Sequence, residues 1–199
     1  MTLVARRCLI ALCAVVVAEL GGLAVVRSGP TTTRGVRGPY PGPTPELAAA
    51  ARQLGIPAPT VDRLQVRWGM PAGLHEPRPG FITAVYYEGH IYLRPTPRPA
   101  DPLAYEYLHD VWARLVPQQR ARLIPLLDGF YGENHRRLRP TLDKLVKADV
   151  SNGATATTAR VDELHSIACS RTSDEHLVPE LRSYCDRVLP GRRITSKRF

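Results

Sequence analysis

The pentad Tyr105–His109 carries residue types that can do metal or acid–base chemistry. An imidazole is a common zinc ligand, and a glutamate can act as a general base. Residues three and four apart share one face of a helix, so Tyr105, Glu106 and His109 are expected to lie together. A pair of imidazoles at the two ends of such a pentad can hold one zinc ion, but here Tyr105 stands at the first end. Glu106 and His109 can also be read as no more than a pair on a helix surface.

A second group of polar residues, Glu163-Leu164-His165-Ser166, occurs on a later predicted helix. Glu163 follows Asp162 near the expected start of that helix, so one interpretation is that it only opposes the helix dipole. His165 lies two residues further on, about 200° around the helix, and is expected to face away from Glu163. Tyr105 is expected to pack with its hydroxyl bonded to His109 or Glu163, the alternative being a metal-bound phenolate.

The periodicity of apolar residues predicts the elements that must position these groups. A strand from Leu64 to Trp68 and a hairpin turning at Glu88-Gly89 predict a small antiparallel sheet. Pro125 is expected to kink or split the helix that opens at Pro117, and Pro140 is expected to interrupt a further helical segment at 133–148. The other helices are expected at 44–55, 101–116, 160–168 and 178–189, with a polar loop at 151–158. The predicted fold class is α+β, a small sheet with a hairpin packed on a helical core.

The N-terminus indicates export or membrane attachment. Arg6 and Arg7 precede an apolar run, Cys8–Val26, whose single charge is Glu19. Its length is about that of a membrane-spanning helix, and it equally resembles a secretory signal. Residues 1–29 are therefore interpreted as a signal-anchor or signal peptide. Residues 30–43 follow as a Pro/Gly-rich linker, 44–190 as the domain and 191–199 as a basic tail.

The cysteines support the same compartment. Cys169 and Cys185 are the only cysteines after the apolar run, so an exported domain is expected to join them in one disulfide. Two buried thiols are the alternative. The net charge of +9 would indicate nucleic acid in a cytosolic protein. In an exported domain a basic surface is expected to contact anionic lipid or envelope polymer, and nucleic acid is not expected as a partner.

Three of these features together resemble the zincin metallopeptidases, and more closely the short gluzincin-type proteins of bacterial envelopes. They are the hairpin Ala84–Leu93, the pentad with Trp112 one turn later, and the later group Glu163–Ser166. The resemblance covers roughly Trp68 to Leu189. It implies a zincin-like fold in which the strand before the pentad helix lines a substrate cleft.

The same resemblance implies roles for single residues. His109 corresponds to the second histidine ligand of zinc, Glu106 to the general base, and Glu163 to the third ligand. Tyr105 replaces the first histidine, and a neutral phenol is a poor ligand. Catalytic zinc has three protein ligands and one open position for water, so losing one ligand removes the activated nucleophile.

These observations predict a membrane-tethered or secreted metallopeptidase-like protein whose catalytic residues are vestigial. It is expected to bind peptides or proteins outside the cytoplasm without zinc. One alternative is an active peptidase that holds a metal with Tyr105, His109 and Glu163. A second alternative is a structural envelope protein with a basic surface.

Overall fold

The computed structural model describes residues 40–71 and 83–192. The predicted signal-anchor, most of the linker and residues 193–199 of the tail lie outside the described residues. The helices are α2 (Pro45–Leu54), α3 (Ala58–Arg63), α4 (Ala100–Arg114), α5 (Pro117–Ser151), α6 (Ala156–Arg171), the 3-10 turn η1 (Asp174–His176) and α7 (Pro179–Val188). The strands are β1 (Arg67–Trp68), β2 (Ala84–Tyr87) and β3 (His90–Leu93). Within the described ranges, none of the helices has the length and apolar character needed to cross a membrane.

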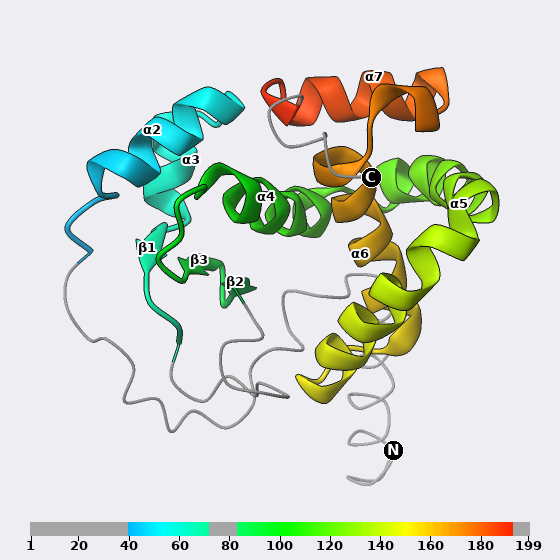
Figure 1. The fold of residues 1–199 in the computed structure, drawn as a ribbon, viewed down its shortest axis with the longest axis horizontal. Coiled ribbons are helices and arrows are strands. Elements are labelled where there is room, and N and C mark those ends of the chain that lie inside the picture. The colour runs from blue at the N-terminus through cyan, green and yellow to red at the C-terminus, as the bar shows by residue number, and fades with distance from the viewer. Residues whose placement is uncertain (1–39, 72–82, 193–199) are drawn as a thin grey trace, which may run out of the picture.

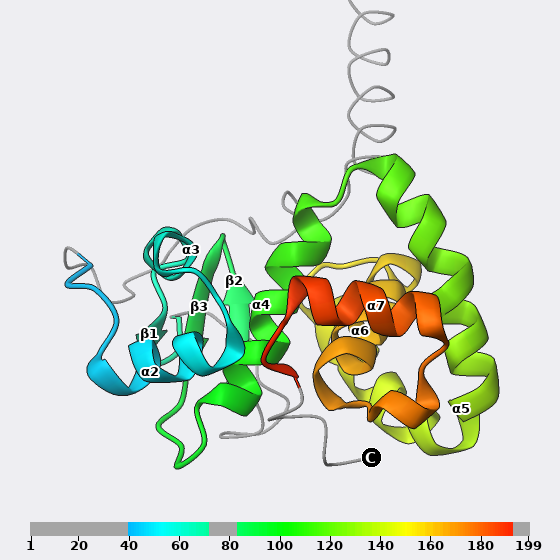
Figure 2. The same ribbon diagram turned by 90° about the horizontal axis from the view of Figure 1, so that it is seen from above.

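Helix α4 is the centre of the fold. Figure 2 shows the sheet with α2 and α3 on one side of α4, and α5, α6 and α7 on the other. Its buried residues include Leu103, Leu108 and Trp112 on the spacing that the sequence predicts for a helix. The pentad therefore lies on a helix that is covered on both sides, between a small sheet and a helical bundle (Figure 1). This arrangement confirms the α+β prediction at the level of fold class.

The sheet is mixed rather than antiparallel throughout. The strand order is β1-β3-β2, with β2 antiparallel and β1 parallel to β3. The predicted hairpin is confirmed, and its two turn residues, Glu88 (φ 51°) and Gly89 (φ 80°), both adopt the left-handed conformation of a tight hairpin turn. The prediction of a purely antiparallel sheet is wrong because the hairpin inserts β3 between β2 and β1, which leaves β3 running in the direction of β1.

Helix α5 continues through both prolines. Pro125 and Pro140 lie on its exposed side, so the carbonyls that lose a hydrogen-bond partner there face water. On its inner side a stripe of Leu123, Leu127, Phe130, Leu138 and Leu142 is buried. This continuous packing keeps one helix, which bends around α6 (Figures 1 and 2). The predicted split at Pro125 and interruption at Pro140 are therefore wrong, and the segment predicted at 133–148 is continuous with the helix that opens at Pro117. The alternative prediction at Pro125, a kink within one helix, is not contradicted.

The last described residues pack against the end of α2, near the start of the described structure. Gly191 donates its N–H to the carbonyl of Leu54 at the end of α2, at 3.1 Å. A Cβ atom at position 191 would lie 2.1 Å from the carbonyl oxygen of Gln53, so only glycine fits there. Arg192 is fully buried and pairs with Asp174 and with Asp186, the latter at 2.7 Å. Both residues, expected in the basic tail, belong to the packed structure.

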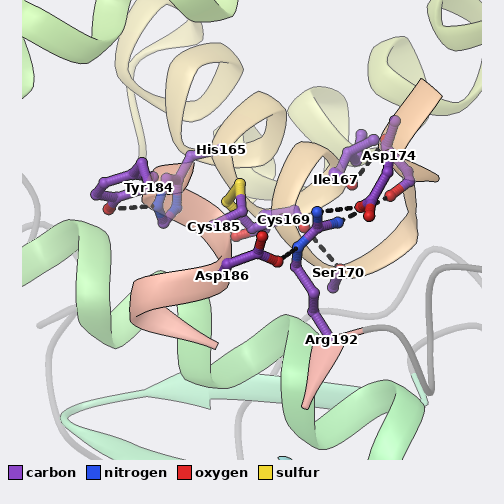
Figure 3. The surroundings of a disulfide bond; sticks show 11 residues. His165, Ile167, Cys169, Ser170, Asp174, Tyr184, Cys185, Asp186 and Arg192 are labelled. Carbon is purple, nitrogen blue, oxygen red and sulfur yellow. Dashed lines mark hydrogen bonds and ion pairs between the residues drawn. A yellow bond between two sulfur atoms is a disulfide. The ribbon is translucent and has the colours of Figure 1, made fainter. Parts of the chain in front are cut away.

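A disulfide joins Cys169 of α6 to Cys185 of α7, with the two Cα atoms 4.9 Å apart. Figure 3 shows this bond between two further links, the Arg192 ion pairs and the contact of His165 with Tyr184. His165 Nε2 lies 2.9 Å from the Tyr184 hydroxyl. The disulfide thus belongs to a set of contacts that fixes α7 onto the helix that carries Glu163.

Reduction of this disulfide is expected to lower the free energy of unfolding by about 3 kcal/mol, because it closes a loop of 16 residues in the unfolded chain. Denaturant unfolding of the full chain with and without reductant measures the difference. The double variant C169A/C185A, which keeps Cys8 and Cys13, is the control and should not respond to reductant. An unchanged midpoint for the unaltered protein would contradict the stabilising role.

Candidate functional site

The structure brings the pentad residues and Glu163 together at the contact between α4 and α6. Tyr105, Glu106 and His109 lie on α4 and are between 4% and 7% exposed. Glu163 of α6 is 3% exposed and faces them. Spacings of three and four residues place the α4 side chains on one helix face, as the sequence predicts. The four side chains that the sequence marks for chemistry therefore share one buried location.

His109 lies between two consecutive carboxylates of α6. Its Nδ1 is 2.9 Å from Asp162 Oδ1, and its Nε2 is 3.9 Å from Glu163 Oε1. A carboxylate only accepts hydrogen bonds, so Nδ1 carries a proton and donates it to Asp162. Burial lowers the pKa of His109, but the charge and hydrogen bond of Asp162, with the charge of Glu163, outweigh it and raise the pKa to about 10. His109 is thus a buried imidazolium.

Tyr105 completes the contact with Glu163. Its hydroxyl donates a hydrogen bond to Glu163 Oε2, and its ring meets the His109 ring edge-on with the centroids 5.2 Å apart. The guanidinium of Arg171 lies over the outer side of the same ring, 4.0 Å from its centroid. Burial and the Glu163 charge raise the pKa of Tyr105 well above its usual value, so the phenol stays neutral. Of the two hydroxyl partners expected from the sequence, the structure selects Glu163.

Glu106 faces the sheet rather than His109. Its Oε2 accepts the backbone N–H of Tyr86 in β2 at 2.6 Å. The Tyr86 hydroxyl in turn donates to Asp110, one turn further along α4, at 3.3 Å. Two consecutive turns of α4 therefore hold Tyr86, one by its main chain and the other by its side chain.

A cleft of about 230 Å³ opens between β2 and the helices beside these residues. One wall is β2 with the residue before it, and the floor is the pentad face of α4. The opposite wall comes from the end of α5 and from α6. The lining residues are Thr83, Ala84, Val85, Tyr87, Tyr105, Glu106, His109, Leu145, Ala148, Asp149, Asn152, Glu163 and Arg171. The cleft therefore runs along β2. The strand directly before the pentad helix, which the zincin resemblance expects to line a cleft, is β3, and none of its residues is among the lining.

The side chains present do not form the ligand set of a catalytic zinc ion. His109 Nε2 and Glu163 are conventional ligands, whereas the third group, Tyr105, is a neutral phenol engaged with Glu163. Within residues 40–71 and 83–192, no group of three or more His, Cys, Asp or Glu side chains is arranged to hold a metal ion. Two ligands fall short of the three that catalytic zinc uses.

Two neighbouring polar residues do not join the site as catalytic groups. His165 pairs with the Tyr184 hydroxyl of α7 and packs on Trp112 of α4, with the ring centroids of His165 and Trp112 5.2 Å apart. Burial lowers the pKa of His165 to about 4, so it is neutral. Ser166 Oγ lies 3.5 Å from His109 Nδ1, the nitrogen that already donates to Asp162. A serine nucleophile needs the opposite nitrogen, so these three residues do not form a catalytic triad.

Sequence reasoning missed the role of Asp162 and of Arg171. The signal for Asp162 is its position next to Glu163, because adjacent residues on a helix can flank a single side chain from a facing helix. Arg171 lies eight residues, about two turns, beyond Glu163 and so lies on the same side of α6. Nothing in the spacing indicates that Arg171 stacks on Tyr105, since that contact joins separate helices.

Searches of protein-family models, curated proteins and solved structures find no match to this chain.

Stability is expected to fall as the pH rises from neutral, by about 2 kcal/mol between about pH 6.5 and about pH 9. The pKa of His109 is raised above its unfolded value of 6.5, so its contribution is complete below that pH and is lost toward pH 10. Burial raises the pKa of Glu163 as well, which acts in the same direction. Denaturant unfolding over this pH range measures the slope.

The variant Asp162→Asn should flatten that slope, because it removes the charge that favours the imidazolium while keeping an oxygen for Nδ1–H. Asp143→Asn is the matched control, since Asp143 is an exposed acid on α5 and should leave the slope unchanged. An equally steep slope in Asp162→Asn would show that another group controls the pH dependence.

Proposed function

We propose that this chain is a metallopeptidase-like protein of the zincin type that has lost zinc catalysis and binds extended peptides in its cleft. The observation that carries the proposal is the convergence of Tyr105, His109 and Glu163 from α4 and α6 beside β2. A metal ion would need all three positions as ligands, and in this chain a phenol–carboxylate hydrogen bond takes the place of one metal bond. Glu106 then has no metal-bound water to activate, and the protein acts without a cofactor.

Charge compensation in the site supports the loss of the metal. The His109 imidazolium lies 2.9 Å from Asp162 and 3.9 Å from Glu163, so a protein side chain supplies a cationic partner to both acids of α6. In a zinc site the metal would provide that positive charge. Burial raises the pKa of Glu163 to about 8, which further reduces the negative charge at this location.

The position of the cleft supports peptide binding. Among the described residues, β2 has a neighbouring strand on one side only, and the cleft follows its other side. An open strand edge recognises an extended peptide through main-chain hydrogen bonds, with pockets for alternate side chains. Attachment to the outer face of a membrane by the N-terminal apolar run is part of the same proposal, and the Cys169–Cys185 disulfide favours that compartment.

The full chain is expected to bind members of an array of random nonapeptides and to release them uncut. Successive N–H groups of an extended peptide point to opposite sides, so either the odd-numbered or the even-numbered residues face β2. N-methylation of the set that faces β2 should abolish binding. N-methylation of the other set is the matched control and should change the dissociation constant by no more than about threefold, since those N–H groups face away from β2. Fluorescence anisotropy measures binding, and mass spectrometry detects cleavage. Chelator-sensitive cleavage would support the active-peptidase alternative, and no binding at all would reject the proposal.

Tyr105→His should create a zinc site, because it supplies the second imidazole four residues before His109 and frees Glu163 from its hydrogen bond. Metal analysis after zinc loading should give about one zinc per chain for the variant and none for the unaltered protein. Tyr107→His, on the same helix but outside the cleft lining, is the control and should bind no zinc. A folded Tyr105→His variant without zinc would count against the zincin assignment.

A further inference from the structure

We propose that the Glu106 carboxylate blocks the Tyr86 N–H at the open edge of β2 and thereby weakens peptide binding to that edge. This proposal rests on the proposed function. In the zincin resemblance this position belongs to the general base. Here its carboxylate accepts the Tyr86 N–H, a donor that a peptide strand bound at this edge would otherwise use.

The register of the hairpin identifies which main-chain groups of β2 face the cleft. Arg94 donates its N–H to the carbonyl of Thr83 at 2.8 Å, so Thr83 and Arg94 form a hydrogen-bonded pair. In an antiparallel ladder such pairs alternate with pairs that exchange no hydrogen bonds. The next pair, Ala84 and Leu93, is therefore of the second kind, and so is Tyr86 with Ile91. The main-chain groups of Ala84 and Tyr86 consequently point away from β3, toward the open edge.

Glu106 occupies one of these outward positions. Its Oε2 accepts the Tyr86 N–H at 2.6 Å. A hydrogen bond to an ionised carboxylate is stronger than one between neutral groups. The side chain of Glu106 is 7% exposed and lines the cleft along with Ala84. A peptide can pair with Ala84 without disturbing Glu106, but it reaches the Tyr86 N–H only by displacing the carboxylate. Charged side chains placed against strand edges are a common means of preventing unwanted strand pairing.

The strand is held in place independently of this bond. The Tyr86 hydroxyl donates to Asp110, and Asp110 is fixed by Arg63 at 2.7 Å and by Arg114 at 3.0 Å. Strand β2 also keeps its ladder with β3. Removal of the Glu106 side chain is therefore expected to uncover the Tyr86 N–H without releasing β2, which makes Glu106→Ala a usable test.

The experiment compares the full chain with Glu106→Ala and Glu106→Gln on the same random nonapeptide array. Glu106→Ala should bind about tenfold more tightly, because the peptide no longer competes with a carboxylate for the Tyr86 N–H. Glu106→Gln keeps an oxygen acceptor at the same position, so it should stay within about threefold of the unaltered protein. Hydrogen exchange at the Tyr86 amide supplies a second readout that needs no peptide. Exchange should be faster in Glu106→Ala than in Glu106→Gln.

The possible failures separate the two proposals. Equal peptide affinity of Glu106→Ala and the unaltered protein, or unchanged exchange at Tyr86, would overturn the blocking role of Glu106 and leave the peptide-binding proposal in place. Weaker binding by Glu106→Ala would also overturn it and would make Glu106 part of the binding surface. Absence of peptide binding by all three proteins would reject the proposed function and, with it, the blocking role of Glu106.

Discussion

His109 of α4 is inserted between Asp162 and Glu163 of α6, and the other contacts at this interface are arranged around that ion cluster. Buried charges are tolerated only where partners surround them, since each loses its hydration. The hydrogen bond of Tyr105 to Glu163 and the stacking of Arg171 on Tyr105 complete the shell. Tight packing of α4 on α6 therefore depends on this cluster being balanced, and the disulfide to α7 holds α6 from its other side.

The cluster also explains how these titratable groups can be buried beside the cleft. Removing one partner from a buried ion pair leaves an uncompensated charge, which costs several kcal/mol. Here the Tyr105 phenol satisfies Glu163, and its ring packs beside His109. Glu106 is engaged with the main chain of β2.

Much of this arrangement could be predicted from the sequence, and the remainder depends on long-range packing. Helical spacing places Tyr105, Glu106 and His109 on one face, and the 200° step sends His165 away from Glu163. The turn at Glu88-Gly89 follows from local conformational preferences. By contrast, α5 is not divided by Pro125, because burial of its inner stripe outweighs a local preference. The burial of Arg192 depends on Asp174 and Asp186, which no short-range pattern connects to it.

The docking of Gly191 on the end of α2 has a consequence for the order in which the chain matures. A protein leaves the ribosome N-terminus first, and early segments commonly fold before later ones exist. Here the carbonyl of Leu54 accepts a hydrogen bond from Gly191, which is synthesised 137 residues later, so this bond can form only after Gly191 has been added to the chain. A methyl group added at Gly191 would collide with the main chain of Gln53, so this contact tolerates no other residue. A polypeptide shortened before this turn would lack the hydrogen bond that joins it to the end of α2.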